Sequence, residues 1–88
     1  MAQTKRIQKD EFTNHLAQRM DTDIATAEAW LNAVTETLFD EFENDRSVTI
    51  KGFGGFYLRK AKNSTIFKFN PGQRLRAILG WSSTYKGD

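Results

Sequence analysis

The sequence contains no cysteine, one proline and one histidine. Without cysteine, neither a disulfide nor a thiolate zinc site can supplement the core. His15 has no second histidine or cysteine to join it, so we interpret it as a surface or packing residue. No apolar run reaches the length of a membrane span, and the first residues lack the apolar segment of a secretory signal. We therefore expect a cytoplasmic protein without metal, cofactor or membrane partner.

Apolar residues are plentiful for so short a chain. At 88 residues, the protein is near the lower limit for a self-sufficient hydrophobic core. It nevertheless carries seven phenylalanines and two tryptophans. We expect a second copy to complete the core through an apolar interface, which makes the protein a homodimer.

The net charge of +2 hides a strong segregation of charge. Residues 21–45 contain eight Asp or Glu and no Lys or Arg, whereas residues 46–88 contain nine Lys or Arg and one Asp. Such a division gives one surface a field that attracts polyanions while the total charge stays modest.

Two helices are predicted in the first half, over Lys9–Met20 and Ile24–Glu43. In the first, Phe12, Leu16 and Met20 follow one another at spacings of four and form a single stripe. The second is apolar on a much wider face, which must be covered from more than one side.

The turn between these helices has candidate capping residues. Either Thr22 or Asp23 can accept hydrogen bonds from the free amides of the second helix. The second helix ends at Asn44 and Asp45, without a glycine.

Alternating apolar and cationic residues predict a three-stranded antiparallel sheet. Val48 and Ile50 mark the first strand, and glycines at its end favour a turn with angles that only glycine adopts cheaply. The predicted strands are Ser47–Lys51, Gly55–Lys62 and Thr65–Phe69.

The last two strands are predicted to form a short basic hairpin. A two-residue loop at Asn63-Ser64 would place Leu58 opposite Phe69, Lys60 opposite Phe67 and Arg59 opposite Lys68. Facing cations cost stability. The Arg59–Lys68 pair therefore indicates a surface across which phosphates lie.

A short helix is predicted after the sheet. Asn70 would cap it, Pro71 would take the first helical position and Gln73 would complete a capping box. The helix would end at Gly80 or Trp81. The fold class is thus α+β: two N-terminal helices, a three-stranded antiparallel sheet with a short basic hairpin, and a short C-terminal helix.

The order of these elements, with the segments IKGFGGFYLRK and KFNPGQRLR, resembles the HU/IHF family of bacterial histone-like DNA-binding proteins. The resemblance covers residues 7–81, which we expect to form the DNA-binding domain, with a flexible arm over 1–6 and a frayed tail over 82–88. It implies an intertwined homodimer, localisation to the nucleoid and a role in DNA condensation. Family members bend DNA through β-arms that enter the minor groove, where a proline at each arm tip wedges between base pairs.

The sequence departs from the family at the arm. The long arm and its Arg-Asn-Pro tip are absent, and the only proline, Pro71, is predicted at the start of the last helix. We therefore expect weak bending or none.

The candidate DNA-binding residues are cations of the hairpin and groups at the starts of two helices. At the last helix, unpaired amides and the positive dipole end would face phosphate. These candidates are Lys9, Arg59, Lys60, Lys62, Lys68, Gly72, Gln73, Arg74 and Arg76. A solvated strand edge is the alternative interpretation of the hairpin lysines.

Nothing in the sequence indicates an enzyme or a small-molecule substrate. The acidic residues Asp40, Glu41, Glu43 and Asp45 imitate a divalent-ion site, but helical spacing spreads them apart. Trp30 and Trp81 fit a core or interface better than base stacking. We expect non-sequence-specific binding of double-stranded DNA. The alternative is a dimeric scaffold protein of the same fold that has lost DNA binding.

Overall fold

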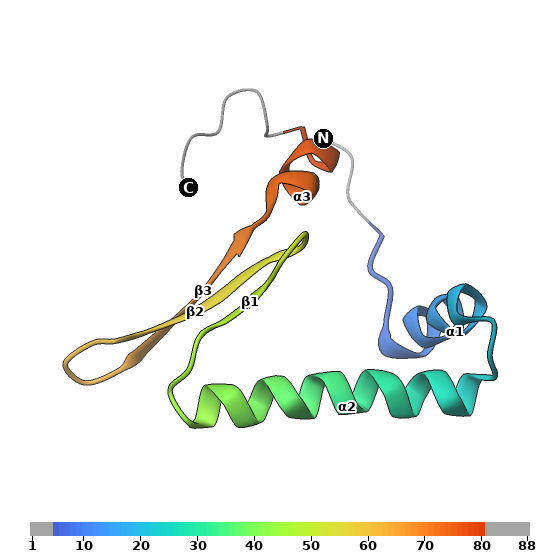
Figure 1. Ribbon diagram of the computed structural model, residues 1–88, viewed down its shortest axis with the longest axis horizontal. Coiled ribbons are helices and arrows are strands. Elements are labelled where there is room, and N and C mark those ends of the chain that lie inside the picture. Colours follow the sequence, from blue (N-terminus) through green and yellow to red (C-terminus); the bar gives the residue numbers. More distant parts are fainter. Residues whose placement is uncertain (1–4, 81–88) are drawn as a thin grey trace. The chain divides into compact units, whose positions relative to one another are not determined.

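The computed structural model describes residues 5–80 and confirms the predicted α+β class (Figure 1). The chain divides into two units, Met1–Thr37 and Leu38–Asp88. Its elements follow one another as α1 (Lys9–Met20), α2 (Ile24–Glu43), β1 (Val48–Ile50), β2 (Gly54–Lys60), β3 (Thr65–Pro71) and α3 (Gln73–Ile78). Helix α2 runs from the first unit into the second.

The turn between α1 and α2 is fixed by its aspartates. Asp21 adopts a left-handed conformation, with φ of 56°, and its amide and that of Thr22 donate to carbonyls of the last turn of α1. Asp23 caps α2, because its Oδ1 accepts a hydrogen bond from the amide of Thr26 at 2.8 Å. Of the two residues predicted to cap α2, Asp23 is the one that does so.

Hydrogen bonding changes the acidity of this cap. The pKa of Asp23 lies below its ordinary value, mainly because the Thr26 side chain donates a hydrogen bond to the carboxylate, with a further bond from the Thr26 amide. The carboxylate is therefore stabilised in its charged form, next to the positive end of the α2 dipole.

Helix α2 ends in the same kind of turn. Asp45 has φ of 60°, its amide donates to the carbonyl of Phe42, and the amide of Arg46 donates to the carbonyl of Glu41. These two bonds form a Schellman motif, in which glycine usually occupies the left-handed position. Here an aspartate occupies it.

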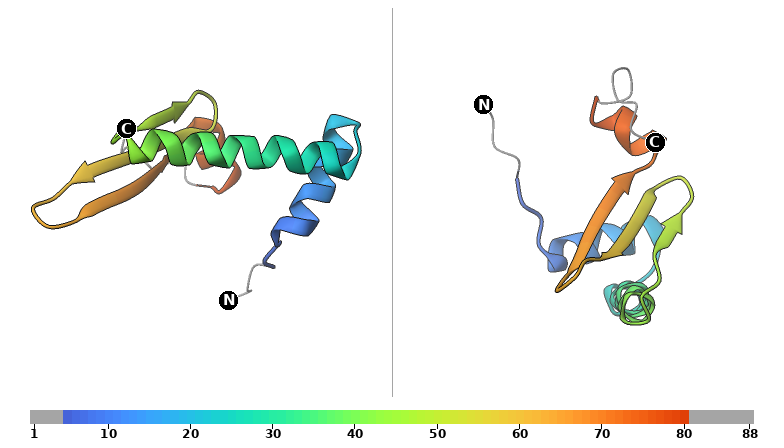
Figure 2. Two further views of the ribbon diagram at one scale, coloured as in Figure 1. Left: turned by 90° about the horizontal axis from the view of Figure 1, so that it is seen from below. Right: turned by 90° about the vertical axis from the view of Figure 1, so that its left-hand side faces the viewer.

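The sheet is antiparallel in the order β1-β2-β3. Strand β1 pairs only with the first three residues of β2, whereas β3 pairs with β2 along its whole length. Beyond β1, strands β2 and β3 continue together as a two-stranded hairpin (Figures 1 and 2).

The predicted register of the hairpin is wrong by two residues. Phe56 lies opposite Phe69, Leu58 opposite Phe67, and the loop spans residues 61–64. The amide of Ala61 donates to the carbonyl of Ser64 at 2.8 Å and closes this loop. A shift by two leaves every side chain on the same face, so the apolar pattern cannot distinguish the two registers. The close pairing of phenylalanines favours the observed one.

Two glycines shape the turn between β1 and β2. Gly52 has φ of 91°, which confirms the predicted need for glycine in this turn. Gly54 is required by close approach, since a Cβ there would lie 2.6 Å from the carbonyl oxygen of Asn70. The absence of side chains at this point lets β3 run alongside β2 as far as Pro71.

An aromatic cluster forms the core of the second unit. Phe56 lies 4.9 Å from Phe69 and 6.1 Å from Phe42, measured between ring centroids. Phe67 meets Phe42 edge-on at 5.3 Å, and Phe53 lies against Phe69 at 5.4 Å. The cluster fixes one face of the sheet against the C-terminal part of α2.

This core is incomplete within a single chain. Among the described residues, the buried side chains are small, namely Thr13, Ala17 and Ala27. Large apolar side chains are instead exposed, among them Trp30 at 54%, Phe39 at 55% and Ile78 at 69%. The wide apolar face of α2 is therefore left without cover in the single chain.

Candidate nucleic-acid interface

The β2–β3 hairpin has one apolar and one basic face. Side chains alternate along a strand, and residues opposite each other in the ladder share a face. Phe56 and Leu58 therefore lie with Phe67 and Phe69 on the side of Phe42. The opposite side carries Tyr57, Arg59, Ile66 and Lys68, which we call the basic face.

The observed register changes the arrangement of cations on the basic face. Arg59 lies opposite Ile66, and Lys68 lies opposite Tyr57, so the predicted Arg59–Lys68 pair is wrong. The two cations are diagonal neighbours, which costs less repulsion than direct opposition. Repulsion between directly facing cations therefore no longer supports phosphate binding here. Both charges nevertheless project from the same face.

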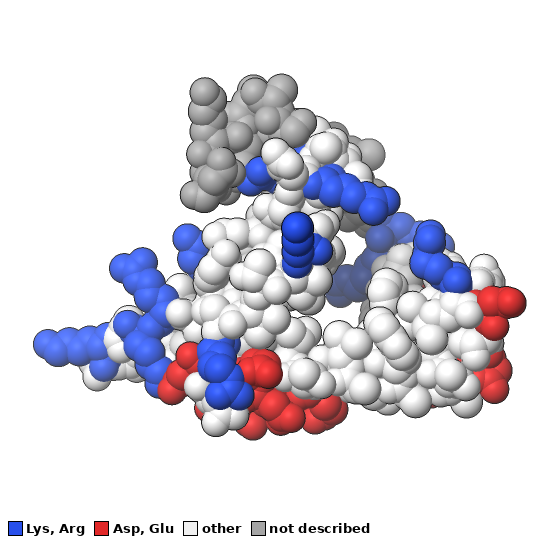
Figure 3. Space-filling view, viewed as in Figure 1, with Lys and Arg blue, Asp and Glu red and all other residues white. Residues whose placement is uncertain are grey.

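Two of the hairpin lysines, Lys60 and Lys62, fall outside the basic face. Lys60 belongs to the apolar side, where its Nζ lies 3.1 Å from Oδ1 of Asp45. Lys62 is exposed in the loop. Figure 3 shows the resulting distribution, with Lys and Arg side chains along the hairpin and Asp and Glu side chains over the end of α2.

A hollow of about 230 Å³ lies where the sheet meets α3. Its polar lining includes Lys51, Tyr57, Asn70 and Arg76. The Tyr57 ring lies against Gly55, where a Cβ would come within 2.7 Å of it. The hollow is thus lined by two cations, a hydroxyl and an amide, a chemistry that suits an anion.

Sequence reasoning missed Lys51 and Tyr57 in this group. Tyr57 precedes Arg59 by two residues, so strand alternation alone places it on the same face. Strand alternation could not have identified Lys51, because its position depends on the β1–β2 turn.

The start of α3 differs from the prediction. Asn70 and Pro71 belong to β3, and Gly72 is the N-cap, without a side-chain capping bond. The predicted Asn70 cap and the capping box with Gln73 are therefore wrong. The amide of Gly72 donates to the carbonyl of Phe53 at 2.8 Å and is already used. Gln73 and Arg74 are exposed at this end of α3.

Lys9 belongs to the first unit. Its Nζ donates to Oδ1 of Asn32 at 2.8 Å, which ties the start of α1 to α2. The side chain is exposed.

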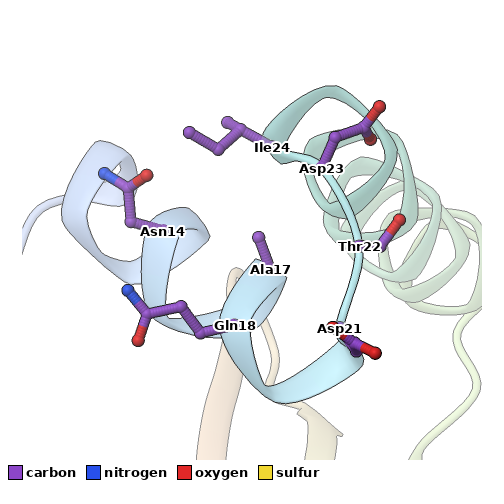
Figure 4. A pocket seen from close by; sticks show the side chains of 7 residues that line it. All are labelled: Asn14, Ala17, Gln18, Asp21, Thr22, Asp23 and Ile24. Carbon is purple, nitrogen blue, oxygen red and sulfur yellow. The ribbon is translucent and has the colours of Figure 1, made fainter.

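A second hollow, at the turn between α1 and α2, has no convergent set of ligands. Figure 4 shows Asp21, Thr22 and Asp23 pointing in different directions around Ala17 and Ile24. Over residues 5–80, no group of three His, Cys, Asp or Glu side chains is arranged to hold a metal ion. In the same range, no helix is long and apolar enough to cross a membrane. Trp81 lies outside the described residues.

Comparisons with known proteins identify both a family and structures of the same fold. The sequence matches the family model of bacterial DNA-binding proteins over residues 7–77. A mutant of HU from Thermotoga maritima has the same fold, with a TM-score of 0.75 and 23% identity over 83% of this chain and 99% of that chain. HU from Anabaena, in a cocrystal with DNA, gives a TM-score of 0.72 and 22% identity over 83% and 97%. No curated protein matches the sequence.

The family match covers most of the chain and includes both candidate regions, the hairpin and the start of α3. It also confirms that the chain is not an enzyme, because the HU/IHF proteins are DNA-binding proteins without catalytic activity. The HU-like order of elements agrees with it. The chain is therefore a histone-like member of the HU/IHF family of bacterial DNA-binding proteins.

Proposed function

We propose that the protein is a nucleoid-associated homodimer that binds double-stranded DNA without sequence specificity, by contacts to backbone phosphates. The observation that carries this proposal is the division of the hairpin into an apolar face against Phe42 and a face bearing Arg59 and Lys68. Cations that contact phosphate supply most of non-specific affinity.

Further contacts extend from the basic face. We expect Lys62, which is exposed in the hairpin loop, and Arg74, which is exposed at the start of α3, to contact phosphate as well. Arg76 lines the hollow with Tyr57. We assign backbone contacts to these residues, with Lys9 at the start of α1 as an additional one.

The uncovered apolar surface supports the proposed homodimer. Trp30 and Phe39 lie on α2 and are each more than half exposed in the single chain. A helix that is apolar over so wide a face needs cover from more than one side. A second copy supplies that cover with the same apolar residues, as a two-fold interface requires.

Bending of the DNA should be weak. The hairpin loop at residues 61–64 contains no proline, and Pro71 lies in β3 at the far end of the hairpin. Ligation of a duplex shorter than the persistence length of DNA into circles measures bending without a defined binding site. We expect the protein to accelerate this ligation little, and a strong acceleration would contradict this part of the proposal.

Single charge reversals test the assignment of the surface. We expect Arg59→Glu to weaken binding to a random-sequence duplex at least tenfold, because it removes a cation and adds a repelling charge beside phosphate. Arg19→Glu makes the same charge change on α1, outside the proposed surface, and should have a much smaller effect.

Fluorescence anisotropy measures the affinities, and circular dichroism checks that both variants fold. Equal losses in the two variants would mean that total charge, rather than the basic face, governs binding. A wild type that fails to bind at low salt would favour the dimeric scaffold protein instead.

A further inference from the structure

One cation of the hairpin is already neutralised by the protein itself. Lys60 and Asp45 form an ion pair of 3.1 Å, with side chains 65% and 60% exposed. Because both groups are solvent-exposed, phosphate can reach Lys60 if the pair opens. None of the other hairpin cations, Arg59, Lys62 and Lys68, has an ion pair within the described residues.

The backbone fixes Asp45 in this position. Its left-handed conformation, with φ of 60°, is set by the amide bonds of Asp45 and Arg46 to the last turn of α2. The guanidinium of Arg46 also pairs with the carboxylate of Glu41, which adds a side-chain link across the same turn. The Asp45 carboxylate is therefore presented by a rigid turn rather than by a mobile loop.

The hairpin is equally constrained on the other side of the pair. Phe67 packs edge-on against Phe42 at 5.3 Å, close to the strand end that carries Lys60. Lys60 alternates with Phe56 and Leu58 and so lies on the face directed at α2. The ring contact and the ion pair together hold the hairpin to the end of α2.

We propose that Asp45 competes with DNA phosphate for Lys60 and thereby lowers the affinity of the hairpin for DNA. This inference rests on the proposed DNA binding. A carboxylate and a phosphate oxygen accept the same charge-assisted hydrogen bonds from an ammonium group. DNA phosphate must therefore displace the Asp45 carboxylate to gain the full contact with Lys60.

The expected effect is modest, because exposed ion pairs contribute little. Replacing Asp45 by Asn should tighten binding about two- to fivefold, the range that corresponds to the usual strength of an exposed pair. Asparagine also tolerates the left-handed conformation, so the turn should persist.

A double-mutant cycle separates competition at Lys60 from a general effect of charge. Affinities for a random-sequence duplex are measured by fluorescence anisotropy at one salt concentration for the wild type, Asp45→Asn, Lys60→Met and the double variant. Glu43→Gln is the matched control, since it removes one negative charge two residues from Asp45, at the end of α2, and Glu43 has no ion pair with any residue of 5–80.

If Asp45 competes for Lys60, then Asp45→Asn tightens binding only where Lys60 is present. In the Lys60→Met background, it should have no more effect than Glu43→Gln. Equal tightening in both backgrounds, or none in either, would overturn the inference while leaving the proposed function intact. Failure of the wild type to bind duplex would overturn both.

Discussion

Two aspartates occupy positions where helices commonly end in glycine. Asp21 and Asp45 both have positive φ, and both lie in turns closed by two backbone hydrogen bonds. A left-handed conformation is costly for most residues but less so for Asp, whose short side chain bonds locally. The glycine missing after α2 is thus replaced by a residue that also supplies a carboxylate to Lys60.

Asp23 makes the stability of α2 depend on pH. Hydrogen bonds from Thr26 lower the pKa of Asp23 in the folded protein, so its contribution to stability is present above the ordinary value of 3.8. The contribution is lost as the pH falls through the lowered pKa, because a protonated carboxyl is a poorer acceptor.

The variant Asp23→Ala should therefore melt at a lower temperature than the wild type at pH 7. The difference should shrink progressively as the pH is lowered below 3.8. Thermal unfolding followed by circular dichroism at several pH values measures it. Asp10→Ala is a suitable control, because Asp10 lies in the first turn of α1 but is not its N-cap. A gap that stays constant down to the acid limit would contradict a role for the charged cap.

At the level of the elements, the contact of Phe67 with Phe42 anchors the part of the hairpin that extends beyond β1. We expect Phe67→Ala to cost about 1–2 kcal/mol of stability, because it removes partly buried apolar area and the edge-on contact with Phe42. Ile66→Ala, the neighbouring change on the basic face, should stay within about 0.5 kcal/mol.

Hydrogen exchange of the amides in β2 and β3 provides the local measurement. In Phe67→Ala, the hairpin amides beyond Leu58 should exchange faster than in the wild type, because the hairpin there pairs with no other strand. Equal protection in the Phe67 and Ile66 variants would mean that the ring contact does not hold the hairpin.

The helices could be predicted from sequence because their signals are local. The bounds of α1 and α2 follow from apolar residues at helical spacing and from the Asp21–Asp23 turn between them. The alternation of Phe56 and Leu58 with Tyr57 and Arg59 was also sufficient to assign the two faces of β2. These features require no knowledge of distant residues.

The errors arose where a distant strand decides the structure. Asn70 and Pro71 have the composition of a helix start, yet both pair with the glycines of β2 and extend β3. An edge strand tolerates proline in this way. The hairpin register was likewise set by the pairing of Phe56 with Phe69, which no local pattern specifies.

For the whole molecule, the exposed apolar face of α2 predicts that stability depends on association. If a second copy covers Trp30 and Phe39, folding is coupled to association, and the thermal midpoint should rise with protein concentration. The midpoint should be measured over at least a hundredfold range of concentration, with sedimentation as an independent measure of mass.

Substitution on α2 locates the interface. Trp30→Glu should shift the protein towards an unfolded monomer, whereas Ala29→Glu adds the same charge on an exposed neighbouring position and should not. A wild type that sediments as a folded monomer, with a midpoint independent of concentration, would contradict the homodimer.

The number of cations that contact phosphate determines how steeply DNA binding should weaken with salt. Binding by phosphate contacts releases counterions, so the logarithm of the affinity falls linearly with the logarithm of the salt concentration, at about −0.9 per phosphate. The six assigned cations of each copy would neutralise about twelve phosphates in the dimer, which corresponds to a slope of about −11. These cations are Lys9, Arg59, Lys62, Lys68, Arg74 and Arg76.

The most direct test of DNA binding by backbone electrostatics is this slope, measured on a random-sequence duplex. We predict a steep negative slope for the wild type, and a slope about two units shallower for Arg59→Gln, which removes one contact from each protomer. An affinity that is independent of salt, or no binding at low salt, would contradict the account.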